Sequence, residues 1–206
     1  MKAINLRNKF NSSTKIISKK EKHRVEQQQI LRLTEELSKN AFTDTQLDRD
    51  NEIIKLLSGK EVTLGEIKSI QKSIAKSRQA YRPTYPQEYY KLMFKLCNLT
   101  LPPGKISYKP KIFARYTNEI IYARFSKEVL PMLQHLNPMV ALGIRKYKHF
   151  QFLTPEAYTR VQTYIQDSIQ TMEECTEWYE FRLKYARKYN LSFQLNLLED
   201  NEGHLK

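Results

Sequence analysis

The sequence predicts a mainly α-helical protein, in which a helical amino-terminal region is joined to a compact helical C-terminal domain with at most a small β element near residues 145–153. Apolar residues recur at spacings of three and four in several segments, and helix-capping signals precede some of these segments. The composition, with 40% hydrophobic and 28% charged residues and only 5 Gly and 8 Pro, is that of an ordinary folded domain. We expect an amino-terminal region over 1–80, a C-terminal domain over 81–190 and a tail over 191–206.

The amino-terminal region is expected to contain three helices. Apolar residues at helical spacing predict the first helix over 19–38, with a face so narrow that it needs a partner surface. Thr43 with Gln46 three positions on resembles a capping box and predicts a second helix that ends near residues 58–59. Thr63 and Glu66 repeat this signature and predict a third helix that stops before Pro83.

Prolines and aromatic residues mark the start of the C-terminal domain. Pro86 suits the first turn of a helix that runs to about residue 96. Three prolines and a glycine predict a surface loop over 98–112. Two shorter helices are expected next, over 116–125 and 129–136, and Asn137-Pro138 ends the second one.

The longest predicted helix follows Thr154. Thr154 can serve as its N-cap and Pro155 as its first residue, and apolar residues spaced by threes and fours continue through Tyr179. One helix reaching about residue 189 is therefore expected. The tail from residue 191 fits either a strand or a short helix.

Composition and cysteine usage exclude several protein classes. No stretch approaches the roughly 18 apolar residues of a membrane helix, and the first residues lack the apolar core of a secretory signal. Cys97 and Cys175 lie far apart, without partners at metal-ligand spacing. We therefore expect a cytoplasmic protein without a metal or cofactor.

The positive charge is concentrated in part of the chain. The formal net charge is +13, and residues 81–160 carry 13 Lys and Arg against 4 Asp and Glu. The C-terminal end is mildly acidic. This distribution favours a localised surface for an anionic partner.

The segment 143–154 (GIRKYKHFQFLT) is the leading candidate for such a surface. Its cations Arg145, Lys146 and Lys148 alternate with aromatic side chains such as Tyr147 and His149. Cations contact phosphates and rings stack on bases, so the mixture favours nucleic acid. The same pattern also fits a short element whose rings pack in the core while its lysines are solvated, and this segment alone leaves both interpretations open.

Residues from about 85 to 180 resemble the phage sixty-three C-terminal-domain family of phage and prophage antirepressor-like regulatory proteins. The resemblance rests on four blocks, taken in order: YPQEYYKLMFKL from Tyr85, YTNEIIYARF from Tyr116, LNP from Leu136, and GIRKYKHFQFLTPE from Gly143. In the last block Tyr147 and Phe150 stand where the family usually has His, so only His149 remains of three histidines, which argues against a multi-His metal site. The resemblance implies a regulatory role in a phage or mobile element, in a bacterial host cell, without implying a known biochemical activity.

Three functions are carried forward as hypotheses. The first is a non-enzymatic regulator of transcription that binds DNA, through phosphate contacts and stacking or edge contacts from Arg115, Arg124, Arg145, Lys146, Tyr147, Lys148, His149 and Gln151. The second is a protein-interaction module, an antirepressor that docks a repressor or host factor through the helix at 19–38 or the tyrosine-rich stretch 81–94. The third and weakest is a nucleic-acid hydrolase using His149, with Glu88 and Glu119 as possible partners, because residues 81–160 contain no Asp and few carboxylates for a two-metal site.

Overall fold

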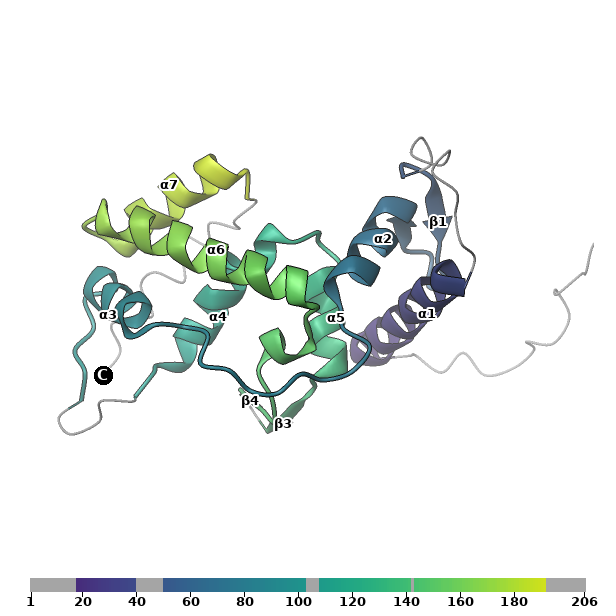
Figure 1. The fold of residues 1–206 in the computed structure, drawn as a ribbon, viewed down its shortest axis with the longest axis horizontal. Coiled ribbons are helices and arrows are strands. Elements are labelled where there is room, and N and C mark those ends of the chain that lie inside the picture. The colour runs from purple at the N-terminus through teal and green to yellow at the C-terminus, as the bar shows by residue number, and fades with distance from the viewer. Residues whose placement is uncertain (1–17, 40–49, 103–107, 142, 192–206) are drawn as a thin grey trace, which may run out of the picture.

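The computed structural model describes residues 18–39, 50–102, 108–141 and 143–191 as packed helices with two small antiparallel hairpins (Figure 1). The prediction of a mainly α-helical fold is confirmed. Its helices are α1 (Lys19–Lys39), α2 (Leu64–Ser73), α3 (Gln87–Leu96), α4 (Lys111–Ile120), α5 (Val129–Leu136), α6 (Pro155–Glu173) and α7 (Trp178–Tyr189), with the 3₁₀ turns η2 (Tyr122–Arg124) and η3 (His149–Phe152). None of the helices in the described ranges is long and apolar enough to cross a lipid bilayer.

The first helix forms as predicted, but the second does not. Thr43 and Gln46 lie outside the described residues, and the described remainder of that segment is the strand β1 (Ile53–Lys55). It pairs antiparallel with β2 (Glu61–Thr63), so that Ile54 lies opposite Val62. Gly59, with a φ of +85°, allows the chain to reverse between the strands. The closely spaced apolar residues near 53–57 fit a short strand as well as a helix, and the pairing with β2 decides between them.

The capping box predicted for α2 is present. Thr63 accepts a hydrogen bond from the Glu66 amide, and the Glu66 carboxylate accepts one from the Thr63 amide. The helix ends at Ser73, ten residues before Pro83. Residues 74–85 then form an extended segment, called here the strap.

The strap is fixed to η3 and to the start of α6 by backbone hydrogen bonds. The Ala75 amide donates to the Phe152 carbonyl (2.9 Å), and the Gln79 amide donates to the Gln151 carbonyl (2.6 Å). In return the Thr154 amide donates to the Ser73 carbonyl (3.0 Å). These bonds satisfy backbone groups that a loop would leave to water, and they hold the strap across the molecule.

The middle helices shift relative to expectation. The helix expected over 116–125 begins earlier, at Lys111, and changes after Ile120 into η2. The helices expected after Pro86 and over 129–136 are present as α3 and α5. The small β element lies slightly earlier than expected, since β3 (Met139–Ala141) pairs with β4 (Ile144–Arg145), while residues 149–152 form η3.

The single long helix expected after Thr154 is two helices. Thr154 does cap α6, with its hydroxyl accepting from the Ala157 amide, but α6 ends at Glu173 and α7 begins at Trp178. The amide and hydroxyl of Thr176 both donate to the Glu180 carboxylate, at 2.8 and 3.1 Å. This local cap starts a new helix, and α7 folds back to pack on α6 (Figure 1).

One buried cluster joins elements from both sides of residue 80. Helix α2 packs against α5 and α6, and its Ile67 and Ile70 are buried in the same cluster as Leu133 and Val161. Two ion pairs cross the same contact, Lys60 with Glu128 at 2.7 Å and Lys127 with Glu66 at 3.1 Å. The division near residue 80 stays a prediction, and the packing joins the two parts closely.

Candidate nucleic-acid interface

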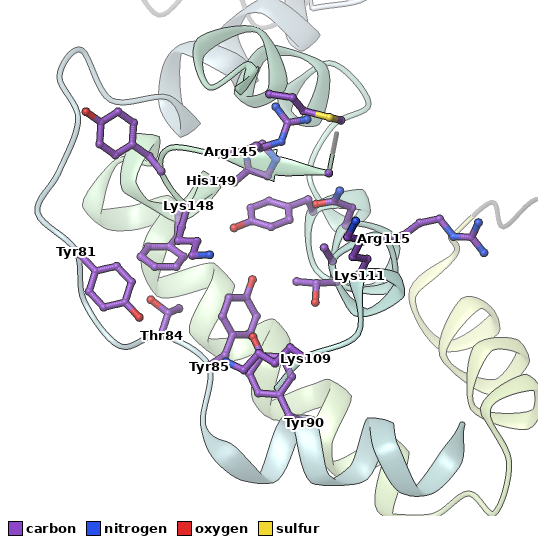
Figure 2. Close-up of a pocket in the computed structure, with 18 of the residues that line it drawn as sticks. Tyr81, Thr84, Tyr85, Tyr90, Lys109, Lys111, Arg115, Arg145, Lys148 and His149 are labelled. Atoms are coloured by element: carbon purple, nitrogen blue, oxygen red, sulfur yellow. The ribbon is translucent and has the colours of Figure 1, made fainter. Parts of the chain in front are cut away.

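A cavity of about 470 Å³ lies where the strap, α3, the start of α4 and the β4–η3 segment meet (Figure 2). Its lining combines cationic and aromatic side chains, and among the described residues no Asp or Glu belongs to it. The cations are Lys109, Lys111, Arg115, Arg145 and Lys148, and the rings are Tyr81, Tyr85, Tyr90, Tyr122, Tyr147, Phe150 and His149. An uncompensated group of cations beside aromatic rings favours an anionic ligand that carries a flat group.

Two lysines of the cavity are close enough to disfavour each other's charge. Burial, and then the positive charge of Lys148, lowers the pKa of Lys109. The Lys109 ammonium lies 3.8 Å from the centroid of the Tyr90 ring, which offers a cation–π contact in place of an anion. An anion bound beside both lysines would relieve this repulsion.

The two arginines of the cavity are held by protein groups. Arg145 donates to the backbone carbonyl of Asn137, and more distantly to that of Gln134 (3.5 Å), so the end of α5 orients its guanidinium. The Arg115 guanidinium lies 3.7 Å from the Glu119 carboxylate, one turn further along α4. The lysines therefore offer the larger gain from an added anion.

His149 is buried at the cavity with one ring nitrogen unused. It donates to the Leu133 carbonyl, and its ring meets the edge of Tyr122 at a centroid distance of 5.5 Å. Its Nδ1 has no hydrogen-bond partner among the described residues. Burial, and then the charge of Arg145, lowers the pKa of His149 to about 4. The ring is therefore neutral near pH 7, and Nδ1 is an acceptor.

The tyrosines of the cavity are neutral hydroxyl groups. Burial raises the pKa of Tyr90 to about 12 and raises the pKa of Tyr85 and Tyr122 further. Tyr81 differs, because it is 62% exposed at the rim and rests against Phe150 at a centroid distance of 5.8 Å. The lining thus has a buried hydroxyl-bearing wall and one exposed ring.

The structure brings five of the eight sequence-predicted residues to the cavity: Arg115, Arg145, Tyr147, Lys148 and His149. Sequence reasoning missed Lys109 and Lys111, which flank Pro110 at the start of α4. The Lys-Pro-Lys pattern was the available signal, since Pro110 stops the preceding loop and places cations on both sides of a helix start.

Three predicted residues do not line the cavity. Arg124 pairs with Asp167 at 2.6 Å, and its guanidinium lies 3.8 Å and 3.7 Å from the ring centroids of Tyr164 and Tyr189. Gln151 is buried and bonded at both ends, accepting from the Lys148 amide and donating to the Gln79 carbonyl. Arg124 and Gln151 therefore have structural roles, while Lys146 is exposed outside the lining.

The acid–base group considered for a hydrolase is not assembled at the cavity. Glu119 is drawn to Arg115 and to Arg182 (3.5 Å), and Glu88 is exposed in the first turn of α3. Neither residue lines the cavity, so His149 meets neither carboxylate there. Within the described ranges, no three His, Cys, Asp or Glu side chains gather where they could hold a metal ion.

The comparison with protein families agrees with the sequence blocks and extends to the strap. Residues 69–161 match the model of the phage sixty-three C-terminal domain. The family resemblance is therefore confirmed, over a range that begins and ends earlier than expected, and it indicates a phage-type protein. The match includes the strap, the cavity-lining residues and the first turns of α6. No curated protein and no solved structure matches the chain significantly.

Proposed function

We propose that this phage-type protein is a regulator that binds nucleic acid, DNA in the first instance, at the cationic and aromatic cavity and does not catalyse a reaction on it. The observation that carries the proposal is the gathering of five cations around one cavity whose described lining has no carboxylate. Arg115, Arg145, Tyr147, Lys148 and His149 keep the binding role expected from the sequence, with Lys109 and Lys111 added. A cytoplasmic place in a bacterial host and a role in transcription belong to the same proposal.

The proposal predicts how binding depends on salt. Each phosphate neutralised on a single strand contributes about −0.7 to the slope of log affinity against log salt. Three lysines give a slope of about −2, which is a loss of about 20-fold between 50 and 200 mM salt. Fluorescence anisotropy with a short labelled oligonucleotide measures this slope. Absent binding at 50 mM salt, or binding that is flat over this range, would refute the proposal.

Matched charge variants locate the binding site. The double variant Lys111→Gln/Lys148→Gln should flatten the slope by about 1.4, because two phosphate contacts are lost. The control Arg187→Gln/Lys188→Gln removes the same charge from the last turn of α7, which supplies no cavity residue. Equal losses in both variants would mean a diffuse electrostatic attraction and not this cavity.

A protein-interaction module is the second candidate function, and one observation favours it. The β3–β4 hairpin carries Met139, Val140 and Ile144, which are 57%, 65% and 54% exposed. Exposed apolar side chains grouped on one hairpin are typical of an interaction site. Capture of a repressor or host factor that survives nuclease treatment, and that Val140→Asp abolishes, would favour this function.

A further inference from the structure

The cavity has the size and closure of a site for a single flat group. Its volume of about 470 Å³ falls within the usual range of small-ligand pockets, roughly 300–1,000 Å³. Bases stacked in a duplex cannot reach such a recess unless they leave the stack. A ligand that fills it would therefore be unpaired.

The polar groups of the cavity ask for two different chemistries. Lys109, Lys111 and Lys148 are donors and suit phosphate oxygens, which only accept. The buried Nδ1 of neutral His149 is an acceptor without a partner among the described residues, so it needs an N–H donor. A phosphate cannot satisfy it, whereas nucleobases carry N–H groups on their edges.

The aromatic lining supplies a place for the flat face of a base. Tyr81 is the exposed ring of the strap, and it packs against buried Phe150 on one side only, at 5.8 Å between centroids. Aromatic rings of this kind stack on bases without preference for sequence. Figure 2 shows Tyr81, Lys148 and His149 arranged around the same cavity.

We propose that the cavity binds one unstacked nucleotide, with its base on Tyr81 and against His149 Nδ1 and its phosphate on the lysines. This inference rests on the proposed nucleic-acid binding and narrows it to single strands or free nucleotides. The shared chemistry is an aromatic base bearing a phosphate.

Anisotropy competition on the full chain tests the base requirement. A labelled oligothymidylate is displaced by unlabelled oligothymidylate, by an abasic oligonucleotide of equal length, by its duplex with oligoadenylate, and by thymidine monophosphate. The abasic strand and the duplex should compete at least 5-fold more weakly than the single strand at equal phosphate number, because stacking on one base contributes about 5- to 100-fold. Competition by the monophosphate at its own higher concentration would show that a free nucleotide suffices, and its failure would assign the site to strands.

Two further probes test the groups named. Tyr81→Ala should weaken the single strand by about 5- to 100-fold but leave the abasic strand unchanged, whereas Tyr179→Ala, at an exposed tyrosine of α7 outside the lining, should change neither. Oligomers of N3-methylthymidine, whose bases lack the N–H of thymine, should bind about 2- to 10-fold more weakly than oligothymidylate.

The outcomes separate this inference from the function on which it rests. Equal binding of abasic and intact strands, both weakened by Lys111→Gln/Lys148→Gln, would overturn the nucleotide site and leave nucleic-acid binding standing. An unchanged affinity of Tyr81→Ala for the intact strand would also overturn it. No binding of any strand at 50 mM salt would remove both.

Discussion

Arg124 illustrates how a cation that resembles a phosphate contact in the sequence can be used inside the fold. Its guanidinium pairs with Asp167, packs on the faces of Tyr164 and Tyr189, and donates to the Tyr185 hydroxyl at 3.2 Å. These partners come from α6 and α7, so Arg124 ties η2 to both helices. No local pattern around residue 124 distinguishes this use from a solvent-facing one.

Replacing Arg124 should therefore affect stability and not binding. Arg124→Gln leaves the half-buried Asp167 without its cation and removes two cation–π contacts, which should lower the free energy of unfolding by about 2–3 kcal/mol. Urea unfolding measures the change. Arg187→Gln, at an exposed site, is the control and should stay within about 0.5 kcal/mol of the parent chain.

His149 should make stability depend on pH. Its pKa is about 4 in the folded chain and near its ordinary value of 6.5 in the unfolded chain, so the unfolded chain binds more protons below pH 6.5. Stability is therefore lost as pH falls, by about 2 kcal/mol between pH 7 and pH 5. Arg145 and the Tyr122 ring, which face the imidazole, maintain this shift.

Urea unfolding at both pH values, with the parent chain and His149→Leu, isolates this contribution. Whatever the stability of the variant at pH 7, its loss between pH 7 and pH 5 should be smaller than the parent's by about 2 kcal/mol. Equal losses in the two chains would contradict the burial of a neutral imidazole.

At the scale of elements, local signals predicted helix starts well and helix ends poorly. Thr63 with Glu66 and Thr154 with Pro155 act within one turn, so the sequence alone reveals them. The strand β1 and the break between α6 and α7 depend on other parts of the chain or on competing caps. Apolar spacing continues across both places and therefore predicted helix.

Thr154 has two bonding roles and gives a test at this scale. Its hydroxyl accepts from the Ala157 amide at 3.2 Å and donates to the Lys72 carbonyl at 2.7 Å, joining the start of α6 to the end of α2. Thr154→Ala should lower the free energy of unfolding by about 1–2 kcal/mol, measured with urea. Thr154→Ser keeps the hydroxyl and should restore most of it, whereas a loss as large as that of Thr154→Ala would point to the methyl group instead.

At the scale of the whole molecule, the sequence predicted one wall of the cavity but not its closure. The 143–154 segment was identifiable because its cations and rings are adjacent in sequence. The opposite side comes from the strap, Tyr90 and the Lys109–Lys111 stretch, which only tertiary packing brings there. The same packing separates Arg124 and Gln151 from the cavity although they are close in sequence to its residues.

The strap predicts how the chain responds to truncation. A fragment of residues 81–191 lacks the Ala75 and Gln79 amides that bond to η3, and it exposes the surface that Ile67 and Ile70 cover. Its thermal unfolding, followed by circular dichroism, should be broad and begin well below that of a fragment of residues 18–191. Equal, cooperative transitions in the two fragments would support a boundary near residue 80.

The course of the strap also matters for anyone who grafts this module behind a different leader protein. One wall of the recess, with Tyr81 and Tyr85, is anchored upstream at Ser73 and downstream at the first residue of α3. A splice at residue 81 would sever the upstream anchor and let this wall swing away. A splice upstream of Thr63 would preserve the recess together with the helix that moors it.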